Sequence, residues 1–101
     1  MTVDVLLSGR LQVDGYGKGH PRRGDGTIRL SLGTGSTVRD LIEGIGVPLD
    51  RVSMTMRNAR RCKLQAGLRS GDRVILIPPD VAAMWRFFGQ QNLGAESVFD
   101  F

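Results

Sequence analysis

The chain has 101 residues and a mass of 11.0 kDa, the usual size of a single domain, which excludes a multidomain enzyme. Hydrophobic residues make up 41% and charged residues 24%, as in globular proteins, which excludes a disordered tail. The longest apolar run, residues 74–79, is too short to cross a bilayer, and Asp4 stands where a secretory signal needs a positive charge. We therefore predict a cytoplasmic protein without membrane contact. A single cysteine, Cys62, agrees with a reducing compartment.

The formal net charge is +4, and twelve of the fourteen basic residues are arginine. This charge allows an anionic partner, but acidic and basic residues are interspersed along the chain. A nucleic-acid binder usually gathers its charge on one face beside stacking aromatic residues. Only residues 57–63, RNARRCK, are locally dense in charge. We interpret them as a solvated strand and turn, and keep Arg57, Arg60, Arg61 and Lys63 as candidate contacts for phosphate or an acidic protein.

The first third of the chain predicts a β-hairpin. Residues 3–13 alternate, with apolar side chains at odd positions such as Val3, Val5, Leu11 and Val13, which predicts one half-buried strand. Residues 14–26, DGYGKGHPRRGDG, contain five glycines and no aliphatic side chain, so we expect an exposed connection. Residues 27–32 alternate again and predict the second strand.

After residue 36 the apolar period changes from two to 3.6 residues. The side chains of one helical stripe are Val38, Leu41, Ile42 and Ile45. Ser36 or Thr37 can cap this helix, and Thr37 with Asp40 approximates a capping box. Gly46 and the proline that follows predict its end.

The remaining strands are short. Residues 52–57 predict a third strand, residues 58–59 a turn, and residues 60–64 a weak, charged edge strand. Residues 68–72 form a turn before residues 74–77, a continuously apolar and therefore central strand. The element order predicts an α+β fold of the β-grasp (ubiquitin-like) type: a mixed sheet of four or five strands on one main helix, with the last strand parallel to the first.

Residues 37–83 resemble the ubiquitin-like sulfur carriers of the MoaD/ThiS family, the small subunit of molybdopterin synthase and the thiamine sulfur carrier. The resemblance lies in TVRDLI at 37–42, the turn at 58–61, LRSGDRV at 68–74 and the Pro78–Pro79 exit. Carriers of this family end in Gly-Gly, because their terminal carboxylate enters a narrow site on an adenylating enzyme and becomes a thiocarboxylate. Here Ala82 and Ala83 stand where the glycine pair is expected, and the chain continues to Phe101. A Cβ at these positions obstructs such an entry.

The segment after the Pro-Pro exit contains five of the six aromatic residues of the chain. We divide the chain into a β-grasp domain, residues 1–79, and a C-terminal helix with an aromatic tail, residues 80–101. Asp80 is the expected cap of that helix, and Val81, Met84, Trp85 and Phe88 share one stripe. The candidate partner-binding residues are Met84, Trp85, Phe87, Phe88, Phe99 and Phe101. Two interpretations stay open: the tail covers its own sheet, or it inserts into a partner's groove; self-association through the same surface predicts the same pattern.

Signals for catalysis are weak, and we predict neither an enzyme nor a cofactor. His20, the only histidine, lies in the glycine-rich connection. Cys62 has no histidine beside it in sequence and no CxxC motif. The glycines at 15, 17 and 19 lack the strand-loop-helix context and the Lys-Ser/Thr ending of a phosphate loop. No cluster of His, Cys or carboxylates has metal-ligand spacing.

The leading hypothesis is a non-catalytic ubiquitin-like interaction module that binds a protein partner through its sheet face and aromatic tail. The family resemblance implies partners such as an adenylating enzyme, a molybdopterin- or tungstopterin-related enzyme, or another sulfur-transfer enzyme. One alternative is a sulfur carrier whose tail is removed by a peptidase. The second is a small basic nucleic-acid-binding protein, which the charge pattern does not favour.

Overall fold

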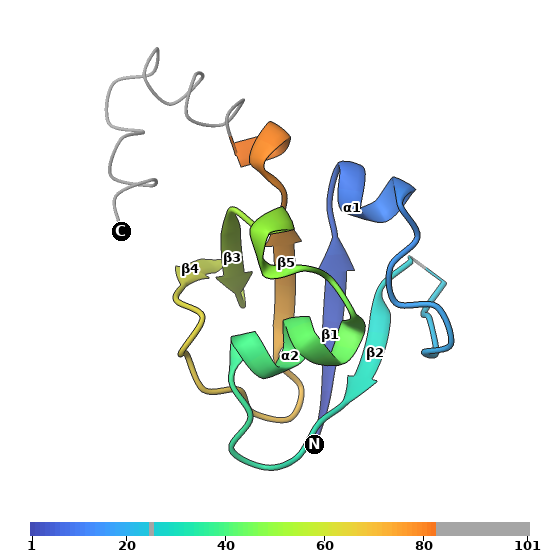
Figure 1. Ribbon diagram of the computed structural model, residues 1–101. Helices are drawn as coiled ribbons and strands as arrows, with labels where there is room; N and C mark the ends of the chain where they lie inside the picture. The colour runs from blue at the N-terminus through green and yellow to red at the C-terminus, as the bar shows by residue number, and fades with distance from the viewer. Residues whose placement is uncertain (25, 83–101) are drawn as a thin grey trace.

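The computed structural model describes residues 1–24 and 26–82. Within them a mixed sheet carries one main helix on one face, as Figure 1 shows. The strands are β1 (Thr2–Leu7), β2 (Ile28–Ser31), β3 (Met54–Arg57), β4 (Arg60–Cys62) and β5 (Arg73–Ile77). The helices are α1 (Arg10–Val13), α2 (Val38–Ile45) and the 3-10 turn η1 (Leu49–Arg51).

The strand order β2-β1-β5-β3-β4 places β5 at the centre and β4 at one edge, as predicted. β1 pairs antiparallel with β2 and parallel with β5, with Val5 opposite both Ile28 and Val74. β5 and β4 flank β3, both antiparallel to it. Parallel pairing of the first and last strands, with the helix as part of the crossover, is the β-grasp arrangement. The predicted fold class is confirmed.

The helix α2 forms where its apolar stripe was expected. Val38, Leu41, Ile42 and Ile45 are all buried against the sheet. Its capping box is complete: the Asp40 N–H donates to Thr37 Oγ1 at 3.3 Å, and the Thr37 N–H donates to Asp40 Oδ2 at 2.9 Å. Gly46 ends the helix in the left-handed region, with φ 87°. Burial of each large side chain contributes roughly 1.5–3 kcal/mol, which holds so short a helix in place.

The single strand predicted over residues 3–13 is wrong after Leu7. Gly9 adopts φ 55° and ψ −132°, a backbone conformation that turns the chain out of the sheet and into α1. Leu11 is still fully buried, but from a helical turn, and Val13, expected in the core, is 78% exposed. Alternation of apolar residues alone could not reveal this turn. The third and fourth strands are also shorter than predicted, beginning at Met54 and ending at Cys62.

Two apolar clusters lie on opposite faces of the sheet. Alternate residues of β5 point to opposite faces, so Val74 and Leu76 join the main core under α2. Ile77 joins Met54 and Ala82 in a second cluster, against which Met56, Ile75 and Val81 also pack. This second cluster lies on the face opposite α2. It is where the chain leaves the sheet.

Candidate functional site

The exit from β5 is the segment that the family resemblance compares with the end of a carrier. Residues 79–82 form a helical turn directly after the sheet, and the Ala82 N–H donates to the Pro78 carbonyl at 3.0 Å. Proline is favoured in the first turn of a helix, so Pro79 starts this one. Asp80 therefore lies inside the turn rather than at the cap, which corrects the predicted cap. The chain therefore leaves the sheet as a folded turn and not as an extended segment.

The helical turn is held against the sheet from two sides. Ala82 is only 2% exposed and packs with Met54 and Ile77. Val81 packs so closely on Gly9 that a Cβ placed on the glycine would lie 2.5 Å from Val81 Cγ2. Real Cβ atoms do not approach so closely, so this contact requires glycine at position 9. The contact went unpredicted; a glycine inside an alternating run was the sequence signal that pointed to it.

The end of β1 is also fastened to the end of β5. The Ser8 backbone N–H and the Ser8 hydroxyl both donate to the Leu76 carbonyl, each at 3.2 Å. These bonds bring Gly9 beside Pro78, whose Cγ would lie 3.3 Å from a Cβ at position 9. The helical turn at 79–82 therefore packs against a surface formed by the connection between β1 and α1.

Of the residues predicted as the carrier-terminus equivalent or as partner-binding, only Ala82 lies within the described part of the chain. It is buried against the sheet, as given above. The others lie outside the described residues: Ala83, Met84, Trp85, Phe87, Phe88, Phe99 and Phe101. Their predicted role in partner binding stays a prediction.

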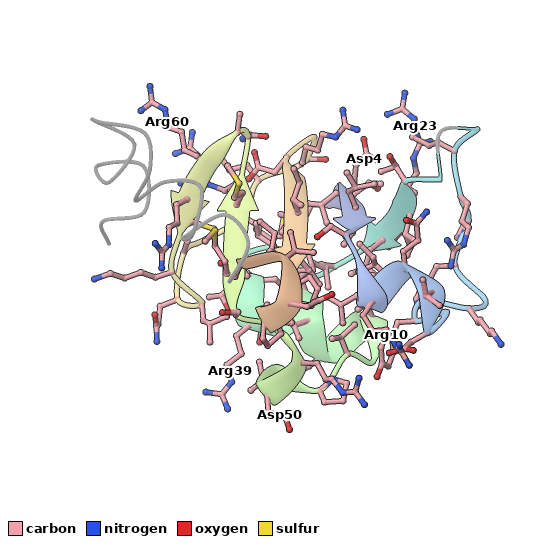
Figure 2. All side chains as sticks on the ribbon, turned by 90° about the horizontal axis from the view of Figure 1, so that it is seen from above. Asp4, Arg10, Arg23, Arg39, Asp50 and Arg60 are labelled. Carbon is pink, nitrogen blue, oxygen red and sulfur yellow. The ribbon has the colours of Figure 1, made fainter. Side chains whose placement is uncertain are left out.

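The four basic residues of the β3–β4 hairpin do not form one patch. Arg57 and Arg60 pair across the hairpin and share one face, while Arg61 pairs with Met56 on the other face. The Arg57 guanidinium donates to the Gly67 carbonyl, and Figure 2 shows Arg60 pointing away from the sheet. Arg61 and Lys63 share a hollow of about 260 Å³ beside Cys62. The hairpin therefore separates basic side chains that are neighbours in the sequence.

Cys62 lies half-buried in β4 and is bonded locally. The Thr55 hydroxyl donates to the Cys62 carbonyl at 2.8 Å, and the Cys62 thiol lies 3.5 Å from Thr55 Oγ1. His20 lies in the connection that leads from β1 to the edge strand β2, whereas Cys62 lies in β4 at the opposite edge of the sheet. The structure therefore brings no base to this thiol from the only histidine.

The glycine-rich connection between β1 and β2 packs on the core. A Cβ at Gly17 would lie 2.5 Å from Ile28 Cδ1, so this glycine allows close packing. The connection is tied to β1 by Arg23, whose guanidinium donates to Asp4 at 2.9 Å (Figure 2). Gly17 is therefore buried in a connection that the sequence predicted to be exposed.

Arg10 and Arg51 approach the exit from α1 and η1. With Pro78, Pro79 and Asp80 they line a hollow of about 420 Å³. Both arginines pair with Asp14, each at 3.3 Å. Their charge is already partly balanced, so the hollow offers no concentrated anion site.

No group of three His, Cys, Asp or Glu side chains in residues 1–24 and 26–82 could hold a metal ion. In the same ranges no helix is long and apolar enough to span a membrane.

Comparison with known proteins agrees with this geometry. The family model described as Mut7-C ubiquitin matches residues 19–84, more than half of the chain. The chain belongs to the Mut7-C ubiquitin family. The match includes α2, β3, β4, β5 and the exit turn. The expected ubiquitin-like relationship is thereby confirmed, and the fold is one typical of non-catalytic modifiers and sulfur carriers.

Two solved structures show the same fold as this Mut7-C ubiquitin chain. A crystal structure of SAMP1 from Haloferax volcanii is 18% identical, with a TM-score of 0.56, and the match covers 78% of this chain and 96% of SAMP1. A second, of H. volcanii small archaeal modifier protein 1, is 19% identical, with a TM-score of 0.59, covering 77% and 97%. A comparison with curated proteins finds no match.

Proposed function

We propose that this chain is a non-catalytic, ubiquitin-like interaction module and does not act as a sulfur carrier. The observation that carries the proposal is the exit from β5. Ala82, at the position of the first carrier glycine, is 2% exposed on the sheet. An adenylating enzyme needs that position extended and free of side chains, because the reacting carboxylate belongs to the next residue.

Releasing the exit would require breaking several contacts at once. Val81 would leave Gly9, Ala82 would leave Met54 and Ile77, and the bond from the Ala82 N–H to Pro78 would open. Even then, no Gly-Gly pair occurs in residues 78–101. Removal of the tail by a peptidase therefore leaves a poor carrier end, which argues against the processed-carrier alternative.

Ubiquitin-like modifiers work by binding protein partners, and we propose the same for this chain. The partner meets the sheet face opposite α2 and the aromatic segment after Ala82. The family's name pairs this fold with Mut7-C, so a Mut7-C domain is the first partner to test. An adenylating, molybdopterin- or tungstopterin-related or sulfur-transfer enzyme, which the carrier resemblance implies, is the second.

Nucleic acid is the weaker alternative. Arg57 and Arg60 share one sheet face and Arg61 lies on the other, so a single strand of nucleic acid does not meet them together. A basic groove beside stacked aromatic residues is the pattern such binding favours. Steep salt dependence of binding to any oligonucleotide would revive this alternative.

The test is adenylation of the full chain. The protein is incubated with ATP, a sulfide donor and an adenylating enzyme of a sulfur-carrier system, and its intact mass is measured with pyrophosphate release. We expect neither an acyl adenylate nor the mass gain of oxygen replaced by sulfur. The matched control is a chain ending after residue 83 with Ala82→Gly and Ala83→Gly, which restores a carrier end. Adenylation of the uncut, unaltered chain would refute the proposal.

A further inference from the structure

A hollow of about 440 Å³ lies at the end of the sheet where β5 begins. Its lining comes from the β3–β4 hairpin and from the segment that leads into β5: Arg57, Asn58, Gly67, Leu68, Arg69 and Asp72. Figure 1 shows that this end of β5 is opposite to the end from which the exit turn leaves. None of the lining residues belongs to the exit or to the second apolar cluster.

The walls of the hollow are joined by hydrogen bonds between the hairpin and the segment before β5. The Asn58 side chain donates from Nδ2 to Asp72 Oδ1 at 2.9 Å, and its Oδ1 accepts from the Arg73 N–H at 2.9 Å. The Arg69 N–H donates to Asp72 Oδ2 at 2.8 Å. Both oxygens of the Asp72 carboxylate therefore already accept a bond from the walls of the hollow itself.

Two guanidinium groups, those of Arg57 and Arg69, line this hollow. Arg57 is half-buried and is held in place by its bond to the Gly67 carbonyl. Arg69 is exposed, and among residues 1–24 and 26–82 no hydrogen bond or ion pair engages its guanidinium. Although desolvation raises the pKa of Asp72, the positive charges of both arginines are among the causes that lower it. Both charges therefore act at the same place.

The charge balance here differs from that of the hollow beside the exit. There the Asp14 carboxylate forms an ion pair with each of the two arginines. In the described part of the chain no such pair joins Asp72 to Arg57 or Arg69. Two guanidinium groups and one carboxylate leave one positive charge in excess. A ligand with a single negative charge balances it, whereas a phosphate dianion meets stronger repulsion from Asp72.

A carboxylate on a short apolar stem suits the shape and the donors of this hollow. Guanidinium groups bind carboxylates through two parallel N–H···O bonds, a geometry that lysine does not offer. Because Arg57 is already fixed by its bond to Gly67, it loses little side-chain freedom when a ligand binds. Leu68, which is 5% exposed, adds an apolar contact for the methylene groups of an acidic side chain.

We propose that Arg57 and Arg69 bind the carboxylate of an acidic side chain that a partner protein presents. That the carboxylate belongs to a protein rests on the proposed function; that the hollow binds a carboxylate does not. The site lies away from the apolar sheet face, so it adds a charged contact at the other end of β5. Such a contact selects among partners and fixes their orientation more than it adds affinity.

The test follows the arginine Nε–Hε resonances of the full-length protein by NMR at constant ionic strength. The probe is the α-amide of N-acetylglutamic acid, which carries one carboxylate, and its uncharged match is the amide of N-acetylglutamine. Arg69→Gln removes one guanidinium but keeps the backbone N–H that bonds to Asp72. Arg39→Gln, at an exposed position on α2, removes the same charge and is the matched control. Arg69→Lys covers the case in which Arg69→Gln does not fold.

We expect the glutamate probe to shift the Arg57 and Arg69 resonances in a saturable manner, and the glutamine probe to shift neither. The Arg57 shift should be lost in Arg69→Gln, weakened in Arg69→Lys and unchanged in Arg39→Gln. Equal shifts at all arginines indicate general screening and would overturn the proposal, as would unchanged binding by the position 69 variants.

Two further probes decide the class of ligand. Tighter binding of inorganic phosphate, or of a thymidine oligonucleotide, at the same two resonances would overturn the choice of a carboxylate. We expect both to bind more weakly than the glutamate probe, because Asp72 repels a dianion and a nucleic acid needs a row of such sites. Adenylation of the intact chain would instead refute the proposed function and leave the carboxylate site standing.

Discussion

The Val81 Cγ2 atom lies 2.5 Å from the position that a Cβ on Gly9 would occupy. These residues are far apart in the sequence, one after β1 and one after β5, and the parallel pairing of these strands brings them together. The missing side chain at position 9 makes room for the exit turn. One glycine thus couples the end of the first strand to the path that the chain takes away from the sheet.

Gly9→Ala should destabilise the fold for two reasons. The backbone at φ 55° disfavours a side chain, at about 1–3 kcal/mol, and the new Cβ meets Val81. Gly19→Ala is the matched control, because Gly19 also has positive φ (89°) but nothing lies within 4 Å of its Cβ position. Urea unfolding should show a larger loss at position 9 than at 19. Equal losses would mean that the Val81 contact contributes nothing.

Adding Val81→Ala separates the backbone strain at position 9 from the contact between the new Cβ and Val81. In the Gly9→Ala background the smaller side chain at 81 should restore part of the free energy of unfolding, since it removes the methyl that the Cβ meets. In the wild-type background the same change should only destabilise. This opposite sign is the signature of a direct contact in a double-mutant cycle.

Loss of the capping box of α2 should lower the free energy of unfolding by an amount typical of helix caps. Thr37→Ala removes the acceptor for the Asp40 N–H and should lower the free energy of unfolding by about 0.5–2 kcal/mol. Thr34→Ala, at an exposed position in the loop before the helix, is the control and should change stability little. Chemical denaturation of both variants measures the two losses in free energy of unfolding. A negligible loss at position 37 would show that packing of the stripe alone holds α2.

Leu41 belongs to the main core and is fully buried. Leu41→Ala should lower the free energy of unfolding by about 2–5 kcal/mol, because it leaves a cavity between α2 and the sheet. Glu43→Ala on the outer side of the same helix loses only an exposed pair with Arg39, so its effect should be small. Thermal unfolding of the two variants compares them. Similar losses would contradict the assignment of the buried stripe.

The fold was predictable where its signals are local. The stripe of α2, its Thr37–Asp40 box and its Gly46 stop are all contained within a few residues, and the structure has each of them. The turn at Asn58 and Ala59 was predictable for the same reason, and both residues have positive φ. The alternation of apolar residues predicted which face of the sheet each strand residue lies on, but it did not predict where the strands end. Leu11 satisfied the alternating pattern while being buried from a helix.

The site was harder to predict because its contacts join distant segments. The Gly9–Val81 contact depends on strand pairing and on the path after Pro79, and neither is encoded near Gly9. The separation of the candidate anion contacts was hard to predict for a related reason. Arg57, Arg60 and Arg61 are neighbours in sequence, but the hairpin sends Arg61 to the other face of the sheet.

The ionisation of the Asp72 carboxyl group predicts how the free energy of unfolding depends on pH. Desolvation raises the pKa of Asp72, but this is outweighed by the hydrogen bonds from the Arg69 N–H and the Asn58 side chain and by the charges of Arg57 and Arg69. The net result is a folded-state pKa below the ordinary value of 3.8. The ionised form is therefore favoured in the folded state.

A lowered pKa means that the stabilising contribution is present above the unfolded-state pKa and is lost as pH falls through the folded-state pKa. Asp72→Asn should accordingly destabilise the protein at neutral pH, and its difference from the wild type should shrink as pH falls below about 4. Urea unfolding over a pH series measures this. Asp50→Asn, at an exposed position on η1, removes the same charge and is the control. A difference between wild type and Asp72→Asn that stays constant down to acid pH would mean that the neutral side chain is held equally well, and that the four favourable interactions do not discriminate the carboxylate.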